Sequence, residues 1–317
     1  MIRVHANDGI SQMGVDALET AGYSVSTTKV AQEQLVDYIN KESIQVLLVR
    51  SATTARKELI DACPELKIIG RGGVGMDNID VEYARSKGLH VINTPAASSA
   101  SVAELVFAHL YGGVRFLHQS NRAMALEGDS NFSTLKKAYA KGRELRGKTI
   151  GIIGFGRIGK AVAQIALGCG MRVMYSDQHV PSATIQLTFY DQQKLDFELT
   201  ESSFDAVLAE SDFITLHVPA QNDYVIGASE LSKMKSGAGL INAARGGVVD
   251  EVALIEALES RHISFAALDV FENEPKPAIQ VLMNEYCSLS PHIGAATNEA
   301  QDRIGEELAA QIIDLMA

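Results

Sequence analysis

Three stretches of the chain carry polar residues in settings where a side chain can meet a ligand. Arg245 stands in INAARGGVVDE, directly after apolar residues and directly before two glycines. Glu274 stands in LDVFENEP, and His292 stands in SPHIGAAT. A guanidinium binds a carboxylate through two parallel hydrogen bonds, and glycines let a backbone approach a ligand closely. These residue types can bind the carboxylate of a small molecule and accept a proton from another of its groups.

Each of these residues alone has an ordinary explanation: a surface arginine in a turn, a solvated acidic turn, and a histidine that is satisfied within the fold. The combination is more specific. A carboxylate beside a histidine fixes the tautomer of the imidazole and suits it to general acid–base work. With Arg245 for a substrate carboxylate, and with a carrier for hydride, the set predicts the oxidation of a 2-hydroxy acid.

A glycine motif indicates the hydride carrier. Gly154, Gly156 and Gly159 form G-x-G-x-x-G in GKTIGIIGFGRIGKAVA, directly after an apolar strand and before a helix. Such glycines make a tight turn that brings the backbone and the helix N-terminus to a pyrophosphate. Asp177 closes the next expected strand, near the roughly 20-residue spacing at which an acid binds the adenosine ribose. Since Asp177 would repel a 2′-phosphate, we predict NAD rather than NADP.

Composition limits the other classes of function. The chain has 317 residues, enough for two sizeable cores, and its formal charge is −11. This acidic chain has no surplus of cations for a nucleic-acid backbone, so we expect no nucleic-acid partner, while a local basic pocket for a small anionic substrate is still possible. Its three cysteines show no CxxC spacing, which favours neither disulfides nor zinc. No apolar run approaches the ~18 residues of a membrane span, and MIRVHANDG is no signal pattern, so we expect a cytoplasmic protein without a membrane partner or a metal.

Short apolar runs alternate with helix-length stretches in two series, which predicts two α/β units on parallel sheets. The first series stops near residue 97, and the second begins at Thr149. Between them we expect one long helix at 98–118 and a polar stretch at 119–147. We expect residues 178–204 to be irregular and without chemistry. The expected elements are strands at 2–6, 46–49, 67–70 and 89–92 and helices at 11–21 and 77–87, then strands at 149–153, 172–175, 213–216, 239–242 and 265–268.

Five segments together resemble a known family. They are GIIGFGRIG, LHVP, INAARGGVVDE, LDVFENEP and SPHIGAAT, and in this order and spacing they are similar to those of the D-isomer-specific 2-hydroxyacid dehydrogenases. The resemblance spans nearly the whole chain and implies that Arg245, Glu274 and His292 are the catalytic residues. His292 would take the hydroxyl proton while hydride leaves to the nicotinamide. Glu274 would hydrogen-bond His292, and Arg245 would hold the carboxylate and polarise the forming carbonyl.

The resemblance also implies the fold: two Rossmann-like or flavodoxin-like doubly wound parallel-sheet domains with the active site in the cleft between them. Residues 1–97 and 291–317 would form the substrate-binding domain, and residues 98–290 would form the NAD-binding domain. The 98–118 and 119–147 segments resemble the family's dimerisation elements, which implies a homodimer.

Further cofactor contacts follow from the resemblance. His217 and Pro219 match positions on the nicotinamide side, although a buried histidine at a strand end explains His217 about equally well. Asp269 matches a residue that contacts the carboxamide. The full set expected to bind NAD is Gly154, Gly156, Arg157, Ile158, Gly159, Asp177, His217, Pro219, Ala243, Asp269 and Gly294.

Within the family, VRSATT, GRGGVGMDNIDVEYARSKGLHVINTP and SVAEL look most like the D-3-phosphoglycerate dehydrogenases. Arg50 and Ser51 match substrate-binding positions, and Gly73 or Val74 would offer a backbone N–H to the substrate carboxylate beside Arg245 and His292. Arg50 could also simply pair with an acid of its own domain. The likeness implies oxidation of D-3-phosphoglycerate to 3-phosphohydroxypyruvate, the entry to serine synthesis. The chain departs from those enzymes after NTP, where Ala-Ala-Ser-Ser replaces a loop that commonly carries asparagine.

Two other interpretations stay open. One is a glyoxylate/hydroxypyruvate reductase or another D-2-hydroxyacid dehydrogenase. The other is an NAD(H)-sensing corepressor, which would keep the glycine motif and Asp177 but tolerate loss of the catalytic trio. A His292→Gln variant separates the last interpretation, because a dehydrogenase would lose its activity and a sensor would keep its NAD-dependent partner binding.

Overall fold

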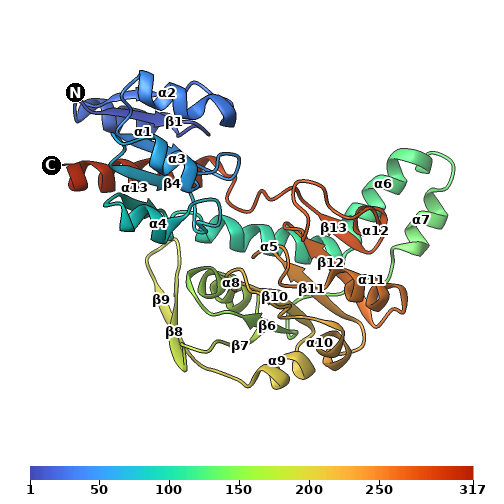
Figure 1. Cartoon of the computed structure of the whole chain (residues 1–317). Coiled ribbons are helices and arrows are strands. Elements are labelled where there is room, and N and C mark those ends of the chain that lie inside the picture. Colours follow the sequence, from blue (N-terminus) through green and yellow to red (C-terminus); the bar gives the residue numbers. More distant parts are fainter. Residues whose placement is uncertain (317) are drawn as a thin grey trace. The chain divides into compact units, whose positions relative to one another are not determined.

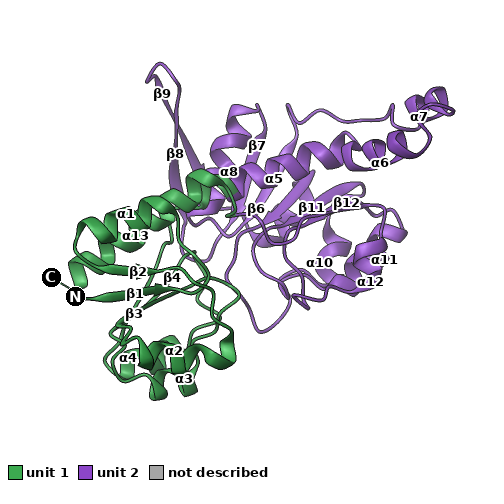
Figure 2. Cartoon of the chain, turned by 90° about the horizontal axis from the view of Figure 1, so that it is seen from above, with its two compact units in different colours: residues 1–101, 295–317 green, residues 102–294 purple. Residues whose placement is uncertain are grey.

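The protein, a computed structural model that describes residues 1–316, consists of two compact units (Figure 2). Unit 1 comprises Met1–Ser101 and the chain from Ala295 onward, and unit 2 comprises Val102–Gly294. The sequence-based boundaries, after residues 97 and 290, lie a few residues earlier along the chain.

Unit 1 is a five-stranded parallel sheet between two helical layers. Its strand order is β2-β1-β3-β4-β5. Helices α1 and α13 cover one face, and α2, α3 and α4 cover the other (Figures 1 and 2). The elements are β1 (Arg3–Ala6), α1 (Gln12–Thr20), β2 (Ser24–Ser26), the 3₁₀ turn η1 (Gln32–Gln34), α2 (Leu35–Lys41), β3 (Val46–Val49), α3 (Lys57–Ala62), β4 (Ile68–Arg71), α4 (Val81–Ser86), β5 (His90–Asn93) and α13 (Asn298–Met316).

The VLLV run of β3 shows why the sequence makes a covered parallel sheet. Val46 and Leu48 pack into the core beneath α1 and α13, while Leu47 and Val49 pack into the core beneath α2–α4. A strand that is buried on both faces must be apolar at every position, because successive side chains point to opposite faces.

Unit 2 is a six-stranded parallel sheet of order β13-β12-β11-β10-β6-β7. Helices α5 and α8 pack on one face, and α9–α12 pack on the other. The elements are α5 (Ser99–Val114), α6 (Leu117–Glu127), α7 (Phe132–Ala138), β6 (Thr149–Ile153), α8 (Arg157–Gly168), β7 (Arg172–Ser176), β8 (Ser182–Thr188), β9 (Lys194–Thr200), α9 (Phe204–Glu210), β10 (Phe213–Leu216), α10 (Ala228–Lys233), β11 (Ala238–Asn242), α11 (Glu251–Glu259), β12 (Ile263–Leu268), α12 (Ile279–Met283) and β13 (Cys287–Leu289).

Each sheet reverses its strand order beside its first strand. In unit 1, β1 lies between β2 and β3, and in unit 2, β6 lies between β7 and β10. Open α/β sheets bind ligands at the carboxyl ends of the strands that flank such a reversal. The prediction of two doubly wound parallel-sheet units is confirmed, and the topology marks one expected ligand position in each unit.

The prediction of one helix over 98–118 is wrong. Helix α5 ends at Val114, Phe116 adopts a left-handed backbone (φ 56°), and α6 then begins at Leu117. The Val114 carbonyl accepts a hydrogen bond from Arg143 N at 2.9 Å. A contact from a distant loop therefore satisfies the helix end, and this signal is invisible in the local apolar periodicity.

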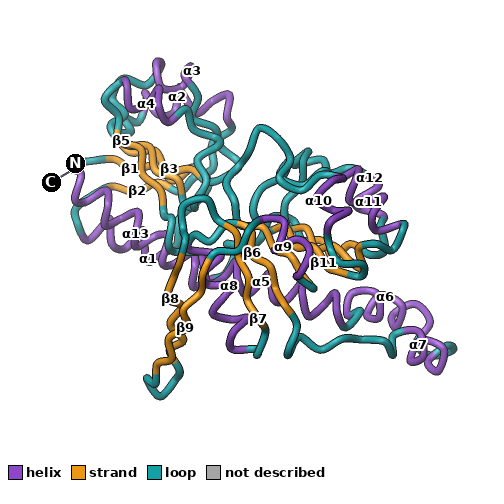
Figure 3. Tube along the Cα trace, turned by 90° about the horizontal axis from the view of Figure 1, so that it is seen from below, coloured by secondary structure: helices purple, strands orange, loops and turns teal. Residues whose placement is uncertain are grey.

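The prediction that 178–204 is irregular is also wrong, because β8 and β9 form an antiparallel hairpin that projects from unit 2 (Figure 3). Ile185 of β8 is buried and joins the core that contains α8, while Tyr190 at the tip is fully exposed. The alternation in SATIQLT fits a strand with one covered face. The short strands β2 and β13 were missed as well, since three residues carry too little pattern.

Candidate active site

Glu274 and His292 are in direct contact in unit 2. His292 Nδ1 lies 2.9 Å from Glu274 Oε2, and Glu274 Oε1 accepts a hydrogen bond from Phe271 N at 3.1 Å. When Nδ1 donates its proton to the carboxylate, the lone pair of the neutral ring stands on Nε2. The pair therefore presents Nε2 as a proton acceptor.

The loop that carries His292 is held by Asp269, which follows β12 and is 2% exposed. The Asp269 carboxylate accepts hydrogen bonds from Ser290 Oγ at 2.6 Å and from Ile293 N and Gly294 N at 2.8 Å each. The Asp269 carbonyl accepts from His292 N at 2.8 Å. His292 itself has φ 55°, a left-handed backbone that a side chain disfavours, so these bonds also maintain an unfavourable conformation. Asp269, expected to contact the cofactor, thus also shapes the histidine loop.

Arg245 lies in the turn after β11, and Asn242 holds this turn. Asn242 Oδ1 accepts from Ala244 N at 3.0 Å, and its amide donates to the Arg245 carbonyl at 2.9 Å. The Arg245 guanidinium donates to the Ala244 carbonyl at 2.7 Å. A Cβ on Gly246 would lie 1.8 Å from the Phe271 carbonyl oxygen. Only a glycine lets the arginine turn pack this closely on the backbone that leads to Glu274.

Arg245, Glu274 and His292 thus follow the carboxyl ends of β11, β12 and β13, which are neighbours in one sheet. Two further hydrogen bonds join the segment after Arg245 to the segment before Glu274. Glu251 and Glu272 each accept a hydrogen bond from the other's backbone N–H, at 2.9 and 3.0 Å. Burial raises the pKa of the Glu251 carboxyl above its usual range. The predicted trio therefore lies on three segments that follow neighbouring strands, and hydrogen bonds join the segments of Arg245 and Glu274.

The glycine motif connects β6 to α8 as predicted, and its shape fits a pyrophosphate. Gly154 has φ 90°, and a Cβ there would lie 2.5 Å from the His217 carbonyl oxygen. A Cβ on Gly159 would lie 2.3 Å from the Gly154 carbonyl oxygen, whereas a Cβ on Gly156 would meet nothing within 4 Å. No side chain caps the N-terminus of α8 at Gly156, and its first turn carries no acidic residue. The first N–H groups of α8 have no partner within the helix, and the space beside Gly156 is open. A phosphate needs both features.

Asp177 follows β7 and is tied to the same loop. Its Oδ2 accepts from Phe155 N at 2.6 Å, and its Oδ1 accepts from His179 N at 2.8 Å. The residue is partly exposed, and each carboxylate oxygen retains a lone pair for a further donor. The position suits a ribose hydroxyl beside the glycine loop.

The other residues expected to bind NAD surround this loop and the neighbouring strand ends. Arg157 begins α8 and is exposed, and Ile158 behind it is half-buried. Pro219 lies after β10, and Ala243 lies after β11. Gly294 donates its N–H to Asp269, and a Cβ there would lie 3.1 Å from the carboxylate. These residues follow the carboxyl ends of strands of the unit 2 sheet, and their contact with NAD stays a prediction.

His217 follows β10 and is electrically neutral. Its ring nitrogen Nε2 lies 3.0 Å from Thr215 Oγ1, while Nδ1 is buried without a hydrogen-bond partner in the part of the chain that the structure describes. Burial lowers the pKa of His217 to about 3. A buried, unpartnered nitrogen beside the glycine loop is consistent with a polar ligand there.

Acidification is expected to destabilise the fold through His217. Between its ordinary pKa of 6.5 and about 3, the unfolded chain binds a proton at His217 that the folded chain does not bind. The free energy of unfolding therefore falls as the pH falls through this window. Denaturant titrations at a series of pH values should show a shallower decline for His217→Gln than for the wild type. Parallel declines would contradict this assignment.

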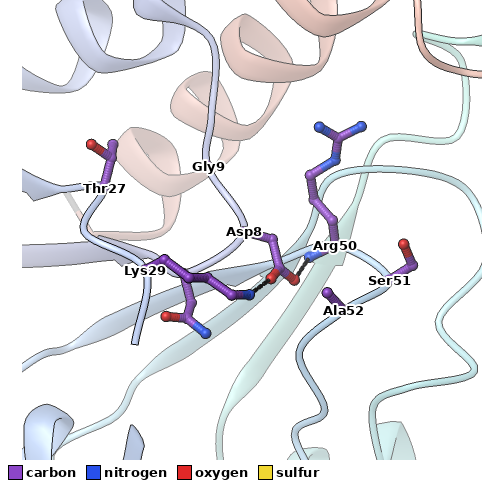
Figure 4. A pocket seen from close by; sticks show the side chains of 8 residues that line it. Asp8, Gly9, Thr27, Lys29, Arg50, Ser51 and Ala52 are labelled. Atoms are coloured by element: carbon purple, nitrogen blue, oxygen red, sulfur yellow. Dashed lines mark hydrogen bonds and ion pairs between the residues drawn. The ribbon is translucent and has the colours of Figure 1, made fainter. Parts of the chain in front are cut away.

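Unit 1 contains a pocket of about 430 Å³ at its own strand-order reversal. Its walls come from the chain just after β1, β2 and β3. Lys29 points its ammonium group at the Asp8 carboxylate, whereas the Arg50 side chain leads away from Asp8 (Figure 4). The lining residues are Asn7, Asp8, Gly9, Thr27, Lys29, Arg50, Ser51 and Ala52. Arg50 and Ser51 were predicted to bind substrate, and Lys29 is a cation that the sequence analysis missed.

Asp8 organises this pocket. Its carboxylate is nearly buried and accepts hydrogen bonds from Lys29, from Arg50 N at 2.7 Å, and from Thr53 N and Oγ1 at 3.0 and 2.7 Å. Burial alone would raise the pKa of Asp8, but these hydrogen bonds outweigh it, and the pKa lies below its usual value. Asp8 is thus ionised and offsets only one of the two cations, so the pocket can still attract an anion.

The predicted Gly73–Val74 contact lies in the loop after β4. The Gly73 N–H donates to the Arg71 carbonyl at 2.9 Å, and the Gly73 carbonyl accepts from Thr94 N at 3.1 Å. Asn93 donates to the Val74 carbonyl at 2.7 Å. Because the N–H of Gly73 is already used, Val74 is the better placed of the two to offer a backbone donor to a substrate.

Other kinds of site find little support in the described chain. Residues 1–316 hold no group of three or more His, Cys, Asp or Glu side chains that could bind a metal ion. None of the helices in that range has the length and apolar character to cross a bilayer.

Comparison with known proteins shows the family that the chain resembles. Residues 107–294 match the model of the D-isomer specific 2-hydroxyacid dehydrogenase, NAD binding domain. The chain is 38% identical to a hydroxypyruvate reductase of Thermotoga maritima, over 98% of this chain and 97% of that one. It is also 38% identical to a D-3-phosphoglycerate dehydrogenase of Methanocaldococcus jannaschii, over 98% of this chain but only 57% of that longer one.

Among solved structures, a D-lactate dehydrogenase of Aquifex aeolicus complexed with NAD and lactic acid is similar, with a TM-score of 0.76 and 30% identity over 99% of this chain and 95% of that one. The glycine loop, Asp177 and the strand-end trio thus occur in a chain whose likeness to these enzymes is continuous along its length. The chain belongs to the D-isomer specific 2-hydroxyacid dehydrogenases, and its unit 2 carries the NAD binding domain of that family.

Proposed function

We propose that this dehydrogenase oxidises D-3-phosphoglycerate to 3-phosphohydroxypyruvate with NAD. The observation that carries the choice of substrate is the unit 1 pocket, whose lining includes the cations Lys29 and Arg50 and the hydroxyl residue Ser51. A phosphate dianion needs such cations in a chain of net charge −11. Relatives include both phosphoglycerate dehydrogenases and a hydroxypyruvate reductase, so family membership alone leaves the substrate open.

The proposed chemistry uses the trio of unit 2. Arg245 pairs with the substrate carboxylate, and Nε2 of His292 accepts the proton of the C2 hydroxyl as the carbonyl forms. Glu274 holds the ring by its Nδ1 and stabilises the imidazolium that results. NAD, when bound, supplies the acceptor for the hydride that leaves C2. The products are the 2-keto acid, NADH and a proton that His292 passes to solvent.

The residues proposed to hold NAD are those that fit it in shape and charge. The backbone at Gly154, Gly156 and the start of α8 would take the pyrophosphate, and Asp177 would take the ribose hydroxyls. His217, Pro219 and Asp269 would lie toward the nicotinamide. This assignment favours NAD because the Asp177 carboxylate repels a 2′-phosphate.

Two charge-removing variants test the phosphate assignment. We expect Lys29→Ala and Arg50→Ala each to lower kcat/KM for D-3-phosphoglycerate about 10- to 100-fold, because a charge-assisted hydrogen bond contributes about 1.5–3 kcal/mol. The value of kcat/KM for unphosphorylated D-glycerate should change little. Initial rates of NADH formation give both values.

Lys41→Ala is the matched control, since Lys41 is an exposed lysine at the end of α2 and does not line the pocket. It should leave both substrates unaffected. Equal losses for phosphorylated and unphosphorylated substrates in Lys29→Ala and Arg50→Ala would refute the phosphate assignment.

Hydroxypyruvate or glyoxylate reduction is the second candidate. The likeness to a hydroxypyruvate reductase over nearly the full length of both chains favours it. Rapid oxidation of NADH with hydroxypyruvate, together with no turnover of D-3-phosphoglycerate, would establish this reaction instead. The Arg245–Glu274–His292 mechanism would serve either substrate.

A homodimer built on α5–α7 is part of the proposal. Leu117, Leu126 and Phe132 on α6 and α7 expose 61%, 79% and 57% of their surface, and these helices project from unit 2 (Figure 2). Apolar side chains so exposed on projecting helices are typical of an interface.

A further inference from the structure

His109 is a buried polar residue in an apolar helix, and the proposed chemistry does not use it. It lies on α5 among core residues such as Val106 and Leu110 and is 8% exposed. Both of its ring nitrogens find partners on the chain around the end of β13. Nδ1 lies 2.8 Å from Ser288 Oγ, and Nε2 lies 2.9 Å from Ser290 Oγ. Apolar packing alone would be served by a leucine at this position. What the histidine adds is its two hydrogen bonds to Ser288 and Ser290.

The direction of these hydrogen bonds follows from Ser290. Its hydroxyl has one proton, which it donates to the Asp269 carboxylate at 2.6 Å. Ser290 Oγ must therefore accept from His109, so Nε2 of His109 carries a proton. Burial lowers the pKa of His109 below its usual value, which leaves Nδ1 as the acceptor of the Ser288 hydroxyl proton. The donors thus run in one direction, from Ser288 through His109 and Ser290 to Asp269.

The end of this chain of donors is the residue that holds the catalytic loop. Asp269 accepts its hydrogen bonds from Ser290 on one side and from Ile293 and Gly294 on the other. His292 lies between them in sequence and has a left-handed backbone. Hydrogen bonds that follow one another in a row polarise and strengthen each other, so this row strengthens the bond that Ser290 donates to the Asp269 carboxylate.

We propose that His109 is a positioning residue that acts through Ser290 and Asp269 to fix the loop carrying His292. This inference rests on the proposed function, because it takes His292 as the acid–base group. By this inference, helix α5 helps to orient the catalytic histidine. This helix packs on the sheet face opposite to α11 and α12. The alternative is that His109 merely fills space in the core.

The test compares two substitutions at position 109. In His109→Leu the donor to Ser290 is lost, and we expect kcat to fall about 10-fold or more, since small misplacements of a reacting group cost up to ~100-fold. In His109→Gln an amide N–H can replace the Nε2 donor, and kcat should recover to within about 3-fold of the wild type. KM for the substrate should change less than kcat in both variants. His262→Leu, at a histidine of unit 2 whose ring bonds the Leu231 carbonyl and none of these residues, is the control and should keep the wild-type kcat.

Ser290→Ala completes a double-mutant cycle. If His109 acts through Ser290, the loss in kcat for His109→Leu with Ser290→Ala should be about that of Ser290→Ala alone rather than the product of the two losses. Multiplicative losses, or equal kcat values for His109→Leu and His109→Gln, would overturn the inference.

Two further measurements separate this inference from the proposed function. Nitrogen-15 NMR of histidine-labelled enzyme should show a neutral His109 with its proton on Nε2, and a proton on Nδ1 alone would overturn the inference without any assay. If His292→Gln keeps full activity, the proposed chemistry has failed. If His292→Gln is inactive while His109→Leu has the wild-type kcat and only a lower thermal midpoint, the inference alone has failed.

Discussion

Replacing His292 with glutamine is expected to lower kcat about 1,000-fold, within the range of roughly 100- to 10,000-fold attributed to general acid–base groups. Glutamine can still donate to Glu274, but its amide cannot accept the hydroxyl proton of the substrate. The loss should appear in kcat, because the carboxylate of the substrate is assigned to Arg245. Rates of NADH formation at saturating substrate give the value directly.

Binding of NADH by His292→Gln is the necessary control. Fluorescence titration should give a dissociation constant within a few-fold of the wild type, because the glycine loop and Asp177 lie on other strands, β6 and β7. A variant that retains more than a tenth of the wild-type kcat would contradict the assignment of His292. An inert wild type that nevertheless binds a partner in an NAD-dependent way would revive the corepressor interpretation.

Gly246→Ala carries the second largest expected effect. The added Cβ would lie 1.8 Å from the Phe271 carbonyl oxygen and 2.5 Å from the carbonyl carbon, so one of the two backbones must move. Either the Arg245 turn or the segment leading to Glu274 then shifts. Displacement of a positioned catalytic group by about 1 Å costs about 100-fold in rate, and we expect a loss of that size in kcat/KM.

Gly247→Ala provides a matched control one residue along the chain. Gly247 has φ 78°, but a Cβ there would meet no atom within 4 Å. The substitution should therefore cost about 1–2 kcal/mol of stability through its backbone conformation while leaving the trio in place. Comparison of kcat/KM with thermal midpoints separates the two effects. Equal activities for the two variants would show that the close packing at Gly246 has no part in catalysis.

The shape of the glycine loop and the contact between Glu274 and His292 were predictable, the first from a local motif and the second from the family resemblance. Gly154 and Gly159 are required by contacts with His217 and with each other, and G-x-G-x-x-G records that requirement within six positions. The pairing of Glu274 with His292 was expected from the family resemblance and is present at 2.9 Å. Such short motifs can be read from the sequence because each residue in them meets a steric or chemical requirement.

Lys29 and His109 could not be found in this way. Lys29 reaches the pocket only because β2 lies beside β1 in the sheet, and TTKV has no feature that distinguishes it from a surface stretch. His109 occupies an ordinary core position on α5, and its partners lie about 180 residues away along the chain. The end of α5 before Phe116 likewise accepts a hydrogen bond from the distant Arg143. Long-range contacts decide these features, and local periodicity does not encode them.

The measurement that tests the central proposal most directly is the ratio of kcat/KM for D-3-phosphoglycerate to that for D-glycerate, with wild-type protein and NAD at alkaline pH, followed as NADH absorbance at 340 nm. With both Lys29 and Arg50 on the phosphate, the ratio should be about 100 or more. A ratio near one, or turnover only in the reducing direction with hydroxypyruvate or glyoxylate, would contradict the account.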